Sequence, residues 1–131
     1  MEQRKVNPWD WQNQFAFSQA IEVTGGSRVL YCAGQTSVDE QGRPLHVGDM
    51  RKQLETALQN LETVLKAAGF TLADVIRLNY YTTDVDKFFE SHDVLTNRFS
   101  QAGCQPSGTL LGVARLAFPG LLIEMEATAV K

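Results

Sequence analysis

The sequence predicts a two-layer α+β sandwich in which helices cover one face of a β-sheet. Strand-like and helix-like hydrophobic periods alternate along the chain in the order β-β-α-β-α-β-β. A helix that follows a strand buries its apolar side against the sheet, which gives two layers. The 131 residues contain no repeat, low-complexity segment or linker, and they suffice to bury a core without disulfides or metal. We therefore expect residues 1–131 to form a single domain.

The first two strands are expected at Phe15–Val23 and Arg28–Ala33. In the first, large side chains alternate with small or polar ones, which is the period of a half-buried strand. Thr24–Ser27 between them contains two adjacent glycines, which adopt positive φ angles at little cost. We expect this turn to close a β-hairpin. Asp39–Pro44, with a glycine and a proline, is predicted to be a surface loop.

Two helices are predicted from apolar residues that recur at steps of three and four. Asp49 is placed to cap a helix over Met50–Ala68, and Gly69 is placed to end it. Asp84 is placed to cap a second helix that continues through Phe99. Each helix is expected to turn its apolar stripe towards the sheet.

Three further strands follow the first helix. Val75–Thr82 is rich in β-branched and aromatic residues, a fourth strand is expected from Gly108 to Arg115, and Leu121–Val130 forms the last. Alternate residues of a strand point to opposite faces. One face of the last strand is apolar, and the other mixes apolar and charged groups: Leu122, Glu124, Glu126, Thr128 and Val130. The mixed face predicts a subunit interface that holds a polar pocket.

The charge pattern argues against some partners. The net charge is −3, and basic residues cluster only at Arg51 and Lys52. Because binding to nucleic acid requires basic surfaces that neutralise phosphates, we expect no nucleic-acid partner. No apolar run reaches the roughly 18 residues of a membrane span, and Met1–Asp10 lacks the apolar core of a signal peptide. We therefore expect a cytoplasmic protein with no membrane partner.

The residue types that hold metals and cofactors are sparse. Cys32, Cys104, His46 and His92 are the only cysteines and histidines, and their spacing fits no zinc site. No glycine-rich phosphate loop follows a strand. We expect no metal and no cofactor, and we expect both cysteines to be reduced thiols.

Several segments, in order, carry a resemblance to a known family. They include Tyr31–Gln35 (YCAGQ), Leu58–Gly69, Asp84–Phe88 (DVDKF), Gln105–Leu116 (QPSGTLLGVARL) and the final strand. Together they resemble the RidA/YjgF family, whose best-known members hydrolyse reactive imines and enamines. The resemblance implies a chorismate-mutase-like fold and a homotrimer, with one small-molecule cleft at each subunit junction.

The same resemblance implies roles for individual residues. Glu124 falls on the family glutamate that positions the attacking water. The family motif P-x-R-x-x-V-x-V-A-R-L carries an arginine that grips the substrate carboxylate, and Gly108 stands at its position. The implied ligand-binding positions are Phe17, Cys32, Ala33, Gly34, Phe88, Gly108, Thr109 and Leu110. Phe17 and Leu110 stand where many members carry more polar residues. The pocket is therefore expected to be apolar and not to bind anions.

Three residues each have two possible roles. His92 lies on the apolar stripe of the second helix, where it is either a core or interface residue or a general base in the cleft. Glu124 and Glu126 share one face of the last strand, where two carboxylates can divide acid and base roles. Alternatively, either is a structural carboxylate that bonds the backbone or Arg115 across the interface; for Glu126 we expect the structural role.

These observations leave two functions open. One is a hydrolytic deaminase for an imine or enamine other than 2-iminopropanoate, in which Glu124 orients water and the backbone at Ala33 and Gly34 stabilises developing charge. The other is a non-catalytic trimer that binds a small apolar metabolite as a sensor, carrier or accessory subunit. Trp9 and Trp11 are expected to anchor the N-terminal arm on the trimer.

Overall fold

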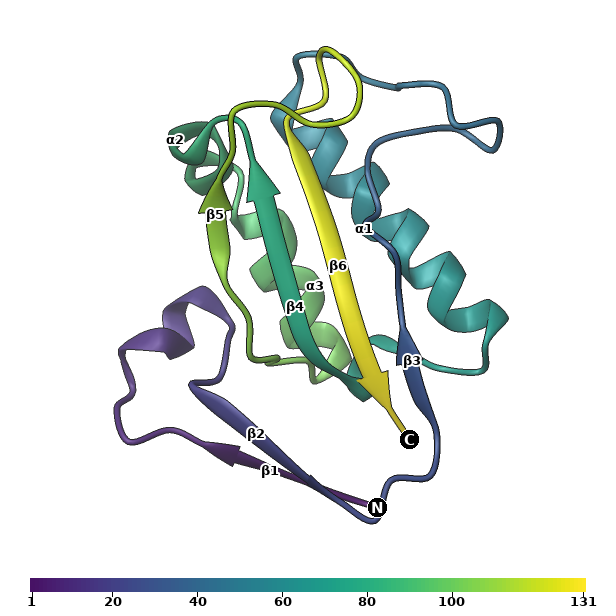
Figure 1. The fold of residues 1–131 in the computed structure, drawn as a ribbon. Coiled ribbons are helices and arrows are strands. Elements are labelled where there is room, and N and C mark those ends of the chain that lie inside the picture. Colours follow the sequence, from purple (N-terminus) through teal and green to yellow (C-terminus); the bar gives the residue numbers. More distant parts are fainter.

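A four-stranded sheet with helices on one face forms the body of the computed structural model, which describes residues 1–131 (Figure 1). β6 pairs antiparallel with β3 and with β4, and β5 joins the other edge of β4 in parallel. The strands, in spatial order, are β3 (Val29–Tyr31), β6 (Ile123–Val130), β4 (Val75–Thr82) and β5 (Leu110–Gly112). The α+β class is therefore confirmed, and β4 has the predicted bounds.

The helical layer lies behind the sheet in Figure 1 and consists of α1 (Met50–Ala67), α2 (Val85–Glu90) and α3 (Asp93–Ala102). The predicted caps are confirmed: the carboxylates of Asp49 and Asp84 accept the backbone N–H of the residue three positions on, at 3.1 and 3.0 Å. The apolar stripe of α1 is buried against β6. No helix is both long enough and apolar enough to cross a bilayer.

The two faces of the sheet differ as predicted from β6. Ile123, Met125 and Ala127 are buried beneath the helices. Glu124 and Glu126, which alternate with them, are only partly buried. We call the side opposite the helices, which carries Asn79 and Tyr81 of β4 and Glu124, Glu126 and Thr128 of β6, the open face.

The N-terminal region differs from its prediction. The expected strand over Phe15–Val23 is wrong, because Trp11–Phe15 forms a 3-10 helix (η1) and Ala16 turns the chain with a φ of 58°. Only Ala20–Thr24 forms a strand, β2. It pairs with β1 (Glu2–Val6), whose charged sequence has no apolar alternation that would predict a strand.

The expected hairpin with Arg28–Ala33 is also wrong. β3 pairs with β6, where it extends the sheet over the core, and β1 and β2 form a separate two-stranded sheet. The turn at Gly25, with a φ of 76°, therefore links two sheets rather than two strands of one. We call residues 1–24 the arm; in Figure 1 it lies below β5.

Two further predictions need correction. The second helix ends at Glu90 and resumes at Asp93, because Ser91 and His92 donate their N–H to the carbonyls of Phe88 and Phe89, three residues back, in a tighter turn. The fourth strand is only Leu110–Gly112, preceded by an isolated pairing of Ser107 with Arg77. The helix break places aromatic side chains and His92 close together.

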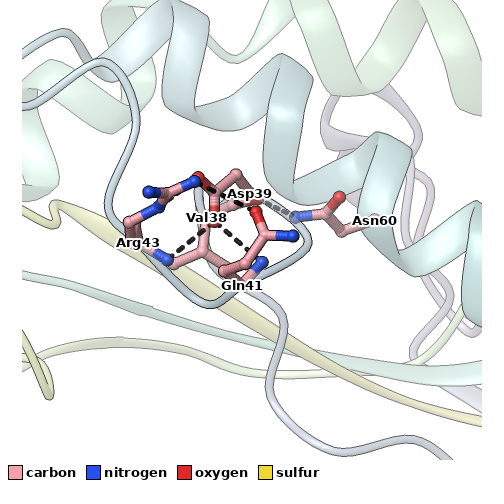
Figure 2. A network of polar contacts seen from close by, with 5 residues as sticks. All are labelled: Val38, Asp39, Gln41, Arg43 and Asn60. Carbon is pink, nitrogen blue, oxygen red and sulfur yellow. Dashed lines mark hydrogen bonds and ion pairs between the residues drawn. The ribbon is translucent and has the colours of Figure 1, made fainter.

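The predicted surface loop is held by a polar network, which Figure 2 shows. The carboxylate of Asp39 accepts the backbone N–H of Gln41 and of Arg43, each at 2.9 Å, and pairs with the Arg43 side chain. Asn60 of α1 donates to the carbonyls of Thr36 and Val38 at 2.9 and 3.1 Å. The segment that follows Gln35 is thus tied to the helical layer.

Candidate functional site

A cavity of about 360 Å³ opens between the arm, β4–β5 and the turn that joins α2 to α3. This volume lies within the range of about 300–1,000 Å³ that is usual for small-molecule sites. Aromatic side chains dominate its walls, and no lysine, arginine, aspartate or glutamate takes part. The lining residues are Trp11, Phe15, Ala16, Phe17, Leu78, Tyr80, Phe88, Phe89, His92, Pro106, Gly108, Thr109 and Leu110.

The arm supplies one wall of the cavity and is fixed there by hydrogen bonds to the segment before β5. Ser18 donates its N–H to the carbonyl of Pro106 at 3.0 Å and its hydroxyl to the carbonyl of Gln105 at 2.5 Å. The Gln105 side chain donates in return to Asn13 and to the carbonyl of Phe17. Trp11 packs edge-to-face against Phe17 with ring centroids 5.6 Å apart and lines the cavity.

His92 sits among three phenylalanine rings. Its ring centroid lies 5.5 Å from that of Phe88 and 6.0 Å from those of Phe15 and Phe89. Burial lowers the pKa of His92, and the nearby Asp93 carboxylate only partly opposes this. The imidazole makes no hydrogen bond within the chain and is neutral at pH 7, so it has an acceptor and a donor for a ligand.

Two more uncharged polar side chains line the cavity. The hydroxyls of Tyr80 and Thr109 make no hydrogen bond within the chain. Burial raises the pKa of Tyr80, so its phenol stays protonated. Tyr80 has no counterpart among the predicted site residues. The alternation of β4 would have placed it on the helix side, but only the docked arm shows that this side holds a cavity.

Gly108 allows a close approach between two segments of backbone. A β-carbon at this position would lie 1.8 Å from the carbonyl oxygen of Leu78. Its φ angle is not in the left-handed region, so an unfavourable backbone angle is not what limits substitution here. The position therefore cannot take an arginine without displacing β4 or the segment before β5.

A second set of predicted residues lies on the open face. Tyr31 pairs with Thr128 and Gln35 pairs with Met125, so the segment that follows β3 has one residue more than β6 between these pairs. The extra residue makes a β-bulge at Ala33 and Gly34, a feature common beside active sites. Both residues are exposed, and neither donates its N–H to another group of the chain.

Glu124 lies against this bulge. A β-carbon at Gly34 would meet the Oε1 of Glu124 at 1.9 Å, so the missing side chain makes the room that the carboxylate occupies. Glu124 has no hydrogen bond or ion pair within the chain, and Arg115, its expected alternative partner, is exposed. The carboxylate and the two N–H groups are therefore available to a ligand or a water molecule.

Glu126 is held by its neighbours instead. The Tyr81 hydroxyl donates to Oε1 of Glu126 at 2.5 Å, and the Asn79 amide donates to the same oxygen at 3.2 Å. These hydrogen bonds lower the pKa of Glu126, and the one from Tyr81 raises the pKa of Tyr81. The arrangement agrees with the structural role expected of Glu126.

The predicted site residues thus form two groups on opposite faces of one sheet. The cavity gathers Phe17, Phe88, His92, Gly108, Thr109 and Leu110, whereas Ala33, Gly34 and Glu124 meet on the open face. Cys32 is buried in the core, and burial raises its pKa; burial also raises the pKa of Cys104 to about 12. Neither thiol is a nucleophile at neutral pH.

Comparison with known proteins identifies the family of this chain. A family model described as Endoribonuclease L-PSP matches residues 11–131. A RutC family protein of Pyrococcus horikoshii is 33% identical over 115 residues, which cover 88% of this chain and 86% of the relative. A solved Yersinia pestis structure, YyfB of the conserved Rid family, is 34% identical and covers 100% of both chains with a TM-score of 0.89. The chain belongs to the RidA/YjgF family.

Two RidA/YjgF relatives carry chemical information in their names. A Rattus norvegicus protein named 2-iminobutanoate/2-iminopropanoate deaminase is 32% identical over 116 residues, which cover 88% of this chain and 80% of that protein. The structure of Escherichia coli TdcF with bound serine is 28% identical and has a TM-score of 0.68, with 88% of this chain and 87% of that one covered. The names of these relatives associate the RidA/YjgF fold with small-molecule ligands and substrates.

Proposed function

We propose that this RidA/YjgF protein is a homotrimeric hydrolase that deaminates an imine or enamine at its subunit junctions. The proposal excludes 2-iminopropanoate as the main substrate, because Gly108 stands where the resemblance puts the carboxylate-binding arginine. Support comes from the fold, from the deaminase relative at 32% identity, and from the arrangement of Glu124 on the bulge.

The observation that carries the proposal is the unpaired carboxylate of Glu124 beside the unpaired N–H groups of Ala33 and Gly34. A carboxylate without a protein partner can accept a proton from a bound water molecule as that water attacks. Adjacent backbone N–H groups are donors for the charge that develops during such an attack. The bulge brings both kinds of group to one point of the open face.

The reaction follows from this arrangement. A water molecule that donates to Glu124 attacks the carbon of the C=N bond, and Glu124 takes its proton. The nitrogen gains a proton from Glu124 as the C–O bond forms, which gives a tetrahedral carbinolamine. Glu124 next takes the proton of the new hydroxyl group and passes it to the nitrogen, so cleavage of the C–N bond releases ammonia and leaves a carbonyl compound. No oxidant, metal or cofactor enters this balance.

Assembly is the step that would join the two groups of residues. Within one subunit the sheet separates the cavity from Glu124, so a complete site needs a second copy. The open face and its rim also expose Val29, Tyr31 and Leu111, with 51%, 80% and 49% of their surface accessible. Burying such side chains against another copy is favourable. In the proposed trimer, the bulge and Glu124 of one subunit meet the cavity of the next.

A second candidate is a trimer that binds an apolar metabolite without turnover. The aromatic, uncharged lining of the cavity favours it, because such walls bind apolar molecules whether or not a reaction follows. The two candidates differ in what Glu124 does. A binding protein needs no water-activating group, whereas a hydrolase does.

The test combines assembly and turnover. Sedimentation should give a mass three times 14.6 kDa for the native protein and for Glu124→Gln. Imines are generated in situ by an amine oxidase or amino-acid oxidase, and their decay is followed with and without the protein. Glu124→Gln should slow hydrolysis about a hundredfold, a loss of about 2.7 kcal/mol of barrier reduction. Glu126→Gln is the matched control and should retain turnover. A monomer, or a Glu124→Gln trimer with native turnover, would contradict the proposal.

A further inference from the structure

We propose that the cavity recognises an aromatic group of an uncharged imine or enamine, so that a ring takes the place of the carboxylate in selecting the substrate. The inference rests on the proposed function for the reaction itself. Recognition of the ring can nevertheless be measured as binding, without any turnover.

The first support is the chemistry of the walls. Six aromatic side chains and one imidazole line the cavity, and no charged residue does: the aromatic ones are Trp11, Phe15, Phe17, Tyr80, Phe88 and Phe89. A carboxylate that entered would lose its water without gaining a counter-charge, which is strongly unfavourable. A ring gains from burial and from edge-to-face contacts with its neighbours.

The second support is size. An engineered apolar cavity of about 150 Å³ is enough to bind benzene. The cavity of about 360 Å³ therefore has space for a six-membered ring together with a chain of a few atoms. A C=N group on such a chain would extend towards the mouth of the cavity, where a partner subunit's carboxylate can meet it.

The third support is the kind of polar group present. His92, Tyr80 and Thr109 line the cavity, and their side chains have no hydrogen-bond partner within the chain. All three are uncharged at neutral pH, and together they offer N–H and O–H donors and an imidazole acceptor. Such a set suits a neutral C=N–H or carbonyl group, which needs hydrogen bonds but no ion pair.

Aromatic walls can also bind cations, but the arrangement of the rings in this cavity disfavours a cationic ligand. A cation binds over the face of a ring. Here the Trp11 and Phe17 rings meet at 74°, the Phe15 and Phe89 rings at 68°, and the Phe88 and Phe89 rings at 77°. In each pair one ring edge already lies against the other ring's face, so fewer faces remain for a cation.

The fluorescence of a native tryptophan can report ligand binding in the cavity. Trp9 and Trp11 are the only tryptophans, and Trp11 alone lines the cavity. In Trp9→Phe protein, the emission of Trp11 is measured against phenylacetone and phenylpyruvate. These two ketones share a benzyl group and a carbonyl and differ in a methyl group against a carboxylate. Phenylacetone should give a saturable change with a dissociation constant at least about tenfold lower than that of phenylpyruvate.

Two variants in the same background locate the binding. Phe89→Ala removes a ring from the wall and should weaken phenylacetone binding about fivefold, the typical effect of one aromatic contact. Phe118→Ala removes an exposed ring that does not line the cavity and should leave the constant unchanged. Equal or tighter binding of phenylpyruvate would overturn the inference, as would tighter binding of 2-phenylethylammonium or no saturable response at all.

Failure of the inference and failure of the proposed function look different. If phenylacetone binds as expected but no imine is hydrolysed, the cavity recognises rings and the hydrolase is wrong. If Glu124-dependent hydrolysis of imines is found while phenylacetone does not bind, the hydrolase stands and the aromatic selection is wrong.

Discussion

The backbone of Gly34 runs so close to the carboxylate of Glu124 that a β-carbon on Gly34 would lie 1.9 Å from Oε1. Glu124 lies in β6, and the bulge in the segment that follows β3 brings Gly34 next to it. The clash would involve the flexible end of a side chain, so the carboxylate rather than the backbone would yield. The orientation of Glu124 thus depends on the absence of a side chain at Gly34.

Gly34→Ala tests this relationship. We expect the variant to fold, because the φ angle of Gly34 is not in the left-handed region, and to lose turnover because the carboxylate is pushed aside. A displacement of about 1 Å at a reacting group costs about a hundredfold in rate. The measurement is imine decay together with thermal unfolding. Gly112→Ala is the matched control, since its new methyl group would lie 3.3 Å from Val85 and far from Glu124. Native turnover in Gly34→Ala would remove Glu124 from the mechanism.

The carboxylate substrate gives a second prediction. Native protein should hydrolyse 2-iminopropanoate weakly, since a charge-assisted contact of about 2–3 kcal/mol is missing. Gly108→Arg should not restore it, because its β-carbon would collide with the Leu78 carbonyl, and the variant should unfold at a lower temperature. Thr109→Arg, at an exposed lining position, should raise turnover of 2-iminopropanoate without that loss of stability. Strong native turnover would show that another residue provides the cation.

The surroundings of His92 predict a pH effect on stability. Because burial lowers its pKa in the folded state, the unfolded chain binds a proton more readily than the folded chain does. The free energy of unfolding should therefore decrease as the pH falls below about 6.5, the usual value for histidine. His92→Gln should reduce that decrease, whereas His46→Gln, at an exposed histidine, should not. Denaturant titrations between pH 7.5 and 5 at about half-unit steps measure the difference. Parallel curves for all three proteins would contradict it.

Gln53 predicts a stability effect remote from both groups of site residues. Its buried side chain donates to the carbonyls of His46 and Gly120 at 2.9 and 2.8 Å and accepts the N–H of Leu122 at 2.7 Å. Gln53→Leu would leave the N–H of Leu122 without a partner, and it would remove one of the two hydrogen bonds that the carbonyls of His46 and Gly120 each accept. We expect a loss of about 2–4 kcal/mol in the free energy of unfolding, measured by denaturant titration. Gln59→Leu, at an exposed glutamine of the same helix, should change it by less than about 1 kcal/mol.

The body of the fold was predictable because its signals are local. Asp49 caps α1 at the expected residue, and the alternation of β6 separates buried Met125 from partly exposed Glu124. The arm was not predictable in this way. β1 has three charged residues among its five and no apolar alternation, and Phe15 and Phe17 have the spacing of a strand but form part of the cavity wall.

The candidate site was likewise predictable only in part. Its predicted positions came from a resemblance that aligns single residues, and that alignment finds His92 and Glu124. It does not find Tyr80 or Phe89. Tyr80 lies on the helix side of β4, where the docked arm completes the cavity, and Phe89 lies just before the break between α2 and α3. Nor does it find the bulge at Gly34, because an extra residue in one strand becomes visible only once the register of its partner is known.

The docking of the arm has a consequence for how a ligand is taken up. Trp11, Phe15 and Phe17 reach the cavity only while the arm is docked, and a two-stranded sheet such as β1–β2 is marginal by itself. Opening of the arm and loss of the cavity are therefore one equilibrium. We expect a ligand held between these rings to slow hydrogen exchange in residues as distant as Glu2–Val6. The first two dozen residues thus gain stability from a filled site that most of them never touch.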